Sequence, residues 1–414
     1  MANPAPADSI GTTAVSAISE RKLLVVLALV QFVNVLDFMM VMPLGPDFVE
    51  GLGISSSRLG WIAGSYTASA AASGLVGMLF LDRFDRRQAL VVALAGLSLG
   101  TIAGGFATGL GSLMLARVLA GAFGGPATAL GLAIIADAIE PKRRGRALGA
   151  VMGAFSVASV LGVPAGLELA RIGGWRMPFF AVGGVCAVVA VATARSLPRL
   201  TLHLAAAKSD PPVGAWQVIR RPVVLIAMAA SGVTMLSVFL IVPNITSYLQ
   251  FNLDFPRTQL GLLYLVGGAF SFFTMRVSGR VADRYGAGVV VTIGTALFIG
   301  ATVAGFVFDH ALLPIMAVFV VFMVSGSFRM VPMNALATRV PRPTERARYM
   351  SIQSTVQHVG AALGASGAAF ILVEEPGGRL LHMREVALVS IALAMLLPVL
   401  IFGVESRVRA AEGP

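Results

Sequence analysis

Long apolar runs alternate with short polar segments along the whole chain. Each run holds about 20 residues, the length that an α-helix needs to cross ~30 Å of hydrocarbon. Twelve helices are expected, at 23–43, 59–80, 88–110, 113–138, 148–170, 177–195, 223–249, 259–277, 288–308, 312–337, 350–373 and 385–404. The pattern therefore predicts an all-α membrane protein with twelve transmembrane helices.

One interior segment separates these runs into six and six. Residues 196–222 contain four prolines and several charged side chains, so this stretch is too polar to span. We expect the following order: a disordered cytoplasmic tail at 1–20, an N-terminal six-helix bundle at 21–195, a cytoplasmic linker at 196–222, a C-terminal six-helix bundle at 223–406 and a cytoplasmic tail at 407–414.

The two halves echo each other at corresponding places. Asp82 and Arg83 follow the second span, and Asp283 and Arg284 follow the eighth. A basic loop opened by proline follows both the fourth and the tenth span. Parallel six-helix repeats about an axis normal to the membrane produce this kind of echo. We therefore expect two pseudo-symmetric bundles.

The distribution of basic residues predicts the topology. The chain has a net charge of +11, which in a soluble protein would point to nucleic acid. However, only 12% of its residues are charged, about half the usual share. Most Lys and Arg residues lie in the tails and the even-numbered turns, and six lie on the other side: Arg58, Arg171, Arg176, Arg257, Arg379 and Arg384. This asymmetry predicts cytoplasmic termini in a bacterial inner membrane and no nucleic-acid partner.

The residues offer little to enzyme chemistry. Cys186 is the single cysteine and lies in an apolar run. The sequence contains no nucleophile–base pair, metal motif or phosphate-binding loop, so direct use of ATP is not expected. We predict a monomer that is not an enzyme, binds no cofactor or metal, and meets only a small-molecule substrate and membrane lipids.

Span one carries the deepest carboxylate in the chain. Asn34 and Asp37 lie three residues apart and share a helix face. An ionisable group at this depth is costly and points to function. Burial disfavours the charged carboxylate, as a proton carrier requires. The alternative is a structural ion pair with Arg117 or Arg329. Helix rise places Asp37 roughly 21 Å and Arg329 roughly 12 Å from the inner ends of their spans, so Arg117 is the better partner.

The loops after spans two and eight carry a repeated motif. Residues 78–87 and 279–288 resemble the G-x-x-x-D-R-x-G-R-R signature of major facilitators, with Met78 and Asp85 at glycine positions of the first copy. An Asp at a helix end can cap another helix, and the arginines can pair with an acid after span four, Asp137 or Glu140. The expected gating residues are Asp82, Arg83, Arg86, Asp137, Asp283 and Arg284.

Spans four and five add two further motifs. Arg117 with Gly121 resembles the intramembrane R-x-x-x-G of proton-coupled facilitators, although Arg117 could instead snorkel to the membrane surface. Gly162-Val-Pro164-Ala-Gly166 resembles a shortened antiporter motif. Small residues at this spacing also allow close helix packing without any transport role. The expected packing residues are Gly153, Gly162, Pro164 and Gly166.

Together these motifs resemble the major facilitator superfamily, in particular its twelve-span drug:proton antiporters and sugar-efflux (arabinose-efflux-permease-like) exporters, over residues 20–406. The resemblance implies proton-coupled export by alternating access, and we expect Asp37 to exchange the coupling proton, with protonation releasing Arg117. It also implies that spans one, four, seven and ten line the substrate path, and that an amphipathic or anionic substrate meets Asn34, Asn244, Tyr248, Arg329 and Asn334. A proton-coupled importer or uniporter, or a lipid or lysolipid flippase, is the alternative.

Overall fold

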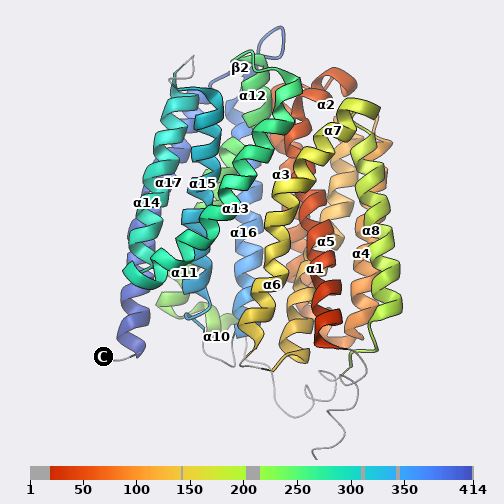
Figure 1. Ribbon diagram of the computed structural model, residues 1–414, viewed down its shortest axis with the longest axis vertical. Helices are drawn as coiled ribbons and strands as arrows, with labels where there is room; N and C mark the ends of the chain where they lie inside the picture. Colours follow the sequence, from red (N-terminus) through yellow and green to blue (C-terminus); the bar gives the residue numbers. More distant parts are fainter. Residues whose placement is uncertain (1–18, 141–142, 202–214, 309–312, 342–345, 413–414) are drawn as a thin grey trace, which may run out of the picture.

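The computed structural model describes residues 19–140, 143–201, 215–308, 313–341 and 346–412. Within these ranges it describes all side chains except those of 78–80, 82, 136, 144–146, 152, 155–156, 215–216, 346–347 and 412. Almost the entire described chain is helical, and the helices stand side by side in one bundle (Figure 1). The predicted tail at 1–20 lies almost entirely outside these ranges.

The N-terminal half consists of α1 (Glu20–Met40), η1 (Met42–Leu44), α2 (Gly45–Leu52), η2 (Ser56–Arg58), α3 (Leu59–Phe80), η3 (Leu81–Arg83), α4 (Arg86–Gly105), α5 (Leu110–Ala138), α6 (Arg144–Val157), the π turn η4 (Ala158–Gly162), α7 (Val163–Gly173) and α8 (Met177–Ser196). All six spans expected in this half are helices. The fifth is interrupted by its π turn.

The C-terminal half consists of α10 (Ala215–Ile219), α11 (Pro222–Ile241), η5 (Val242–Asn244), α12 (Ile245–Phe251), η6 (Arg257–Gln259), α13 (Leu260–Tyr285), α14 (Ala287–Thr302), the π turn η7 (Val303–Val307), α15 (Ile315–Ala337), α16 (Arg346–Ile371), strands β1 (Val373–Glu374) and β2 (Leu380–Leu381), and α17 (Met383–Glu412). The sequence did not predict the antiparallel hairpin of β1 and β2. It also placed a tail from 407, where α17 continues.

In the described part of the chain, nine helical segments are long and apolar enough to cross a membrane. Three further expected spans, α3, α6–η4–α7 and α16, are also helices but are richer in small and polar residues. The prediction of an all-α, multi-pass membrane protein is therefore confirmed. The count of twelve spans and the division at 196–222 stay predictions.

The first spans of the two halves break in the same way. Pro43 lies in η1 and Pro243 lies in η5, and each 3-10 turn leads directly into a short helix, α2 or α12. Proline lacks the N–H that an α-helix would use and clashes with the preceding turn. These matched breaks give the two halves a common reference point for comparing their residues.

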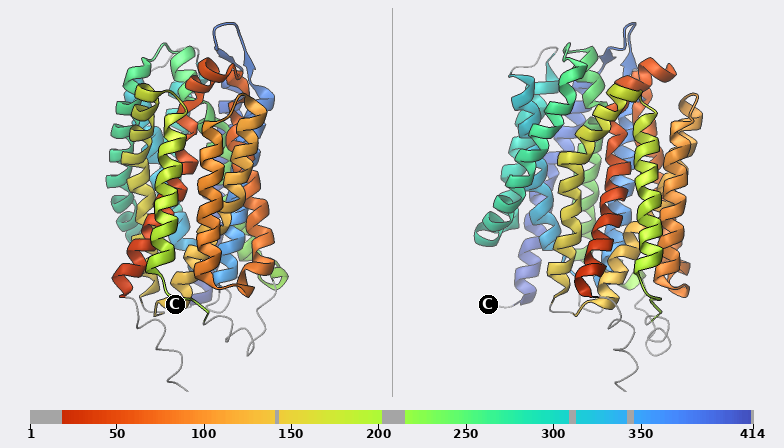
Figure 2. Two further views of the ribbon diagram at one scale, coloured as in Figure 1. Left: turned by 90° about the vertical axis from the view of Figure 1, so that its right-hand side faces the viewer. Right: turned by 45° about the vertical axis from the view of Figure 1, so that its right-hand side comes forward.

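Two ends of the bundle can be distinguished. The start of α1 and the end of α17 lie at one end, which we call the termini end, and the hairpin of β1 and β2 lies at the opposite end, the hairpin end (Figures 1 and 2). One cluster of buried apolar residues is shared by both halves and includes Leu44 and Phe48 beside Ile245 and Tyr248. Two other clusters, around Leu27 and around Val224, each belong to one half. The shared core therefore joins the halves toward the hairpin end.

Candidate functional site

A buried ion pair connects spans one and four. Nη1 of Arg117 donates to Oδ1 of Asp37 at 2.9 Å, and Nη2 donates to the Asp37 backbone oxygen at 3.3 Å. Both side chains are 1% exposed. Arg117 therefore does not snorkel to the surface, and the depth argument chose the right partner for Asp37.

The carboxylate of Asp37 is held asymmetrically. The Thr101 hydroxyl on α4 lies 2.7 Å from Oδ1, the oxygen that Arg117 also contacts. Oδ2 is buried and has no hydrogen-bond partner among the described residues. The two oxygens therefore differ: Oδ1 has both side-chain contacts, and Oδ2 has no described partner.

An aromatic ring and an amide extend this network into α3 and α5. The Arg117 guanidinium lies over the Tyr66 ring, 4.4 Å from its centroid. The Tyr66 hydroxyl donates to Oδ1 of Asn34 at 3.1 Å, and Nδ2 of Asn34 donates to the Gly124 carbonyl at 2.9 Å. Asn34, predicted as a substrate ligand, thus fixes the ring under Arg117. No residue pattern singles out Tyr66, because its partners lie on other helices.

Arg329 is the second buried arginine. Its side chain is 0% exposed, its Nη2 donates to Oγ of Ser237 at 2.9 Å, and its guanidinium lies 4.3 Å from the centroid of the Phe298 ring. Nε and Nη1 are buried without a partner among the described residues. These contacts lie within the C-terminal half, and Asp37 pairs with Arg117 instead.

The other residues predicted to bind substrate do not gather around Arg329. Asn244 is buried in η5, where its Nδ2 lies 3.4 Å from the Leu240 carbonyl oxygen. Tyr248 is buried in α12, with its ring 5.5 Å from that of Phe306. Asn334 is exposed on α15. None of these contacts involves Arg329, and the substrate-binding role of the five residues stays a prediction.

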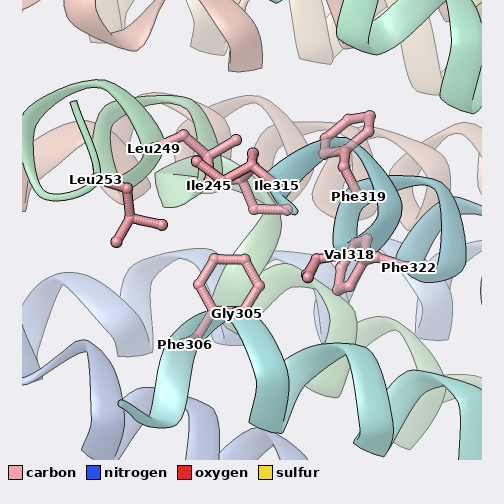
Figure 3. A pocket seen from close by; sticks show the side chains of 9 residues that line it. All are labelled: Ile245, Leu249, Leu253, Gly305, Phe306, Ile315, Val318, Phe319 and Phe322. Carbon is pink, nitrogen blue, oxygen red and sulfur yellow. The ribbon is translucent and has the colours of Figure 1, made fainter. Parts of the chain in front are cut away.

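An apolar hollow lies between α12, η7 and α15 (Figure 3). Its walls include Leu249, Phe306, Val318 and Phe322, and it has space for about one water molecule. No polar side chain lines it. It is a packing defect beside a π turn and is too small for a substrate.

The motif after span two forms contacts at the termini end. Nε of Arg86 lies 3.3 Å from Oδ2 of Asp137, the pairing expected across this loop. Asp85 replaces a glycine of the family signature. Its Oδ1 accepts from the backbone N–H of Arg87 at 2.8 Å and from that of Leu200 at 3.1 Å, so Asp85 caps α4 and holds the chain after α8. The side chain of Asp82 lies outside the described residues, and Arg83 is exposed.

The second copy of the motif uses a different acid. Asp283 and Arg284 are both exposed. Instead, Glu405 of α17 accepts from the backbone N–H groups of Ala287 at 3.2 Å and Gly288 at 2.7 Å, and so caps α14. The sequence analysis missed Glu405. An acid directly after the end of an apolar run, on the expected basic side, was the available signal.

Polar contacts close the hairpin end between the two halves. Nη2 of Arg257 in η6 lies 2.9 Å from both carboxylate oxygens of Asp47 in α2. The Ser56 backbone N–H donates to Glu374 Oε2 at 2.7 Å, and the Ser56 hydroxyl donates to the Gly378 carbonyl at 3.0 Å. The sequence analysis identified none of these contacts, because they join short connecting segments.

Close glycine packing reinforces this contact between the halves. A Cβ at Gly60 on α3 would collide with the carbonyl oxygen of Ala365 on α16. In the span-five element, a Cβ at Gly162 would come 2.5 Å from Leu36, which confirms a packing role there.

The other members of the span-five element contribute less. Gly166 has room for a Cβ in ordinary contact with Met40, at 3.7 Å. Pro164 follows the π turn at the start of α7 and is partly buried. Gly153 is exposed, and a Cβ there would meet no described atom within 4 Å. The packing role predicted for Gly153 is therefore wrong.

Substituting Asp47 with Asn should favour opening of the hairpin end. A partly exposed ion pair contributes about 0.2–1 kcal/mol, so the open-to-closed ratio should rise roughly 1.4- to five-fold. Spin labels at Glu50 and Arg379, both exposed, would report the distance between the halves. Glu385→Gln is the control, because the ion-pair partner of Glu385 is His382, three residues earlier in the same half. Unchanged distances in Asp47→Asn would show that the pair does not hold this end closed.

Comparison with known proteins identifies the family. The model of the Major Facilitator Superfamily matches residues 27–365 and 230–412. The chain is 26% identical over 364 residues to a chloramphenicol resistance protein of Streptomyces lividans, covering 87% of this chain and 91% of that one. It is 32% identical over 177 residues to a puromycin resistance protein of Streptomyces alboniger, covering 42% and 35%.

A solved structure shares the fold. The bacterial homologue of the human lysosomal transporter Spinster, in an inward-facing and unoccupied conformation, has a TM-score of 0.71 at 18% identity and covers 97% of this chain and 98% of that one. The chain belongs to the Major Facilitator Superfamily. It is a multi-pass membrane transporter and not an enzyme.

Proposed function

We propose that the protein exports a small amphipathic or anionic molecule in exchange for protons. The observation that carries this proposal is the buried Asp37 carboxylate, which has one oxygen without a described partner and is paired with Arg117 inside the bundle. The drug-resistance relatives support export as the direction.

Protonation of Asp37 would change the contacts of three helices. The ionised carboxylate attracts Arg117 strongly, because the pair is removed from water. A proton on Oδ2 removes that attraction and frees the guanidinium, which stacks on Tyr66 of α3 and belongs to α5. Because Gly60 of α3 packs directly against α16, a shift of α3 would reach the other half.

The polar contacts at the two ends of the bundle would act as the two gates of an alternating-access cycle. We place the termini end in the cytoplasm, since most basic residues lie in the segments expected there. The contacts of Asp47 and Ser56 would then form a closed outer gate. The pair of Arg86 and Asp137, together with Asp82, would belong to the inner gate.

Transport into proteoliposomes tests this function directly. Vesicles with an acidic lumen should accumulate substrates from a panel of chloramphenicol, puromycin, benzoate and a pentose, because protons leaving the lumen drive uptake. A protonophore should abolish the accumulation. Accumulation only with the opposite gradient would make the protein a symporter and would overturn the proposal, as would uptake that ignores the gradient.

A further inference from the structure

The C-terminal half contains a buried positive charge without a described acid beside it. The Arg329 side chain is fully buried, and only its Nη2 has a hydrogen-bond partner, the neutral hydroxyl of Ser237. An uncompensated charge at this depth in a membrane protein is costly. Some group must offset the charge, and the described residues around Arg329 do not supply it.

The N-terminal half shows which kind of group pairs with an arginine at the corresponding place: there the partner is a carboxylate. Asp37 lies six residues before Pro43, and Ser237 lies six residues before Pro243, at the matched breaks of spans one and seven. Arg117 binds the residue at this position in its half, and Arg329 binds it in the other. The two halves therefore build the same arginine contact, but the second has a hydroxyl where the first has a carboxylate.

The aromatic support of the arginine is also kept. The guanidinium of Arg117 lies 4.4 Å from the Tyr66 centroid, and that of Arg329 lies 4.3 Å from the Phe298 centroid. The rings come from different helices, α3 and α14, so this resemblance is in geometry and not in sequence position. Each ring covers one face of the cation and leaves its edge for hydrogen bonding.

A hydroxyl donor is kept as well. Thr101 contacts the Asp37 carboxylate and is the sixteenth residue of α4, counted from Arg86. Thr302 is the sixteenth residue of α14, counted from Ala287, and its buried hydroxyl has no described partner. Thr302 also lies one helical turn from Phe298, on the same face of α14. The second half therefore retains the donors of the first and lacks only the acceptor.

We propose that an anion from outside the chain binds between Arg329 and Thr302, where it takes the place that the Asp37 carboxylate has in the other half. Nε and Nη1 of Arg329 have no described partner and lie on different edges of the guanidinium, so one of them donates to the anion, together with the Thr302 hydroxyl. One positive charge selects a monovalent anion. Its source is either the carboxylate of the transported molecule or chloride from the medium.

In its first form this inference rests on the proposed function, because it names carboxylates as the substrate class of the C-terminal half. If the anion is chloride from the medium, the inference does not depend on the proposed function. A carboxylate can accept from the guanidinium with one oxygen and from the hydroxyl with the other, whereas chloride accepts from the same donors as a sphere. The two sources therefore share one site and compete for it.

Direct binding to the purified protein in detergent tests the site. Radiolabelled chloride and radiolabelled benzoate would be titrated in a zwitterionic buffer that holds no other small anion. Each should bind saturably and displace the other. Ser237→Asp places an acid beside Arg329 and should weaken binding by about ten-fold or more, equivalent to about 1.4 kcal/mol. Ser237→Asn has the shape of the Asp variant without its charge, so it should weaken binding only by occupying space, and therefore less than Ser237→Asp does.

Each outcome is decisive. Binding of benzoate alone identifies the carboxylate of a substrate, and binding of chloride alone identifies a counter-ion from the medium. Wild-type binding in Ser237→Asp, or binding of neither anion to the wild type, would overturn the proposal. Should Ser237→Asp not fold, Thr302→Val serves instead and should raise the dissociation constant several-fold. Because binding needs no gradient, its failure leaves the proton exchange untouched, and a failed exchange leaves the site untouched.

Discussion

Substitution of Asp37 with Asn should abolish proton-driven accumulation while leaving a folded protein in the membrane. The amide keeps the shape of the side chain and can still accept a hydrogen bond from Arg117, but it cannot exchange a proton. Accumulation driven by an acidic lumen should fall to the level of protein-free vesicles. Exchange of labelled for unlabelled substrate without a gradient should remain, because the site that binds substrate is not removed.

A buried threonine provides the matched control for this experiment. Thr67 is also fully buried, on α3, but its hydroxyl contacts only the Ala63 and Gly64 carbonyl oxygens of its own helix. Thr67→Val should retain the proton-driven component. Full proton coupling in Asp37→Asn would remove Asp37 from the coupling step and leave the pair with Arg117 a structural one.

Substitution of Gly60 with Ala should prevent the hairpin end from closing fully. The added Cβ meets the backbone carbonyl of Ala365, and a backbone atom cannot move aside by changing rotamer. Overpacking of this kind costs about 1–3 kcal/mol. The ratio of closed to open protein at this end should therefore fall roughly 5- to 150-fold, since 1.4 kcal/mol corresponds to a factor of ten. Transport should fall with it, because each cycle passes through the closed form.

Gly261 offers a control at the beginning of α13, near the same end. A Cβ there would meet no described atom within 4 Å, so Gly261→Ala should leave transport and the distance between the halves unchanged. The spin-label pair at Glu50 and Arg379 would report both variants. Wild-type distances together with wild-type transport in Gly60→Ala would show that α3 and α16 separate without cost, contrary to the packing argument.

The helical membrane fold could be predicted because it depends on one quantity, the length of each apolar run. That quantity is local, so span 59–80 coincides with α3 to the residue. The hairpin of β1 and β2 was missed because its strands are two residues long and lie between spans. The π turn before Pro164 was missed because no residue pattern distinguishes an inserted residue from a regular turn.

The site could be predicted only as far as depth along a helix determines it. Depth paired Asp37 with Arg117 correctly. Which neighbour a given helix face contacts depends on how the helices pack together. The spacing of residues within one apolar run does not determine this. For this reason Tyr66 and Thr101, which complete the network around Asp37 and Arg117, were not predicted.

The hairpin of β1 and β2 is attached unequally to the two halves. It connects α16 to α17, and Asn252, directly after α12, binds the backbone of Leu380 twice, at 2.9 Å in each direction. Its polar contacts with the N-terminal half, by contrast, run through the single residue Ser56. When the halves separate at this end, the contacts of Ser56 with the hairpin should break, and the hairpin should move with the C-terminal half.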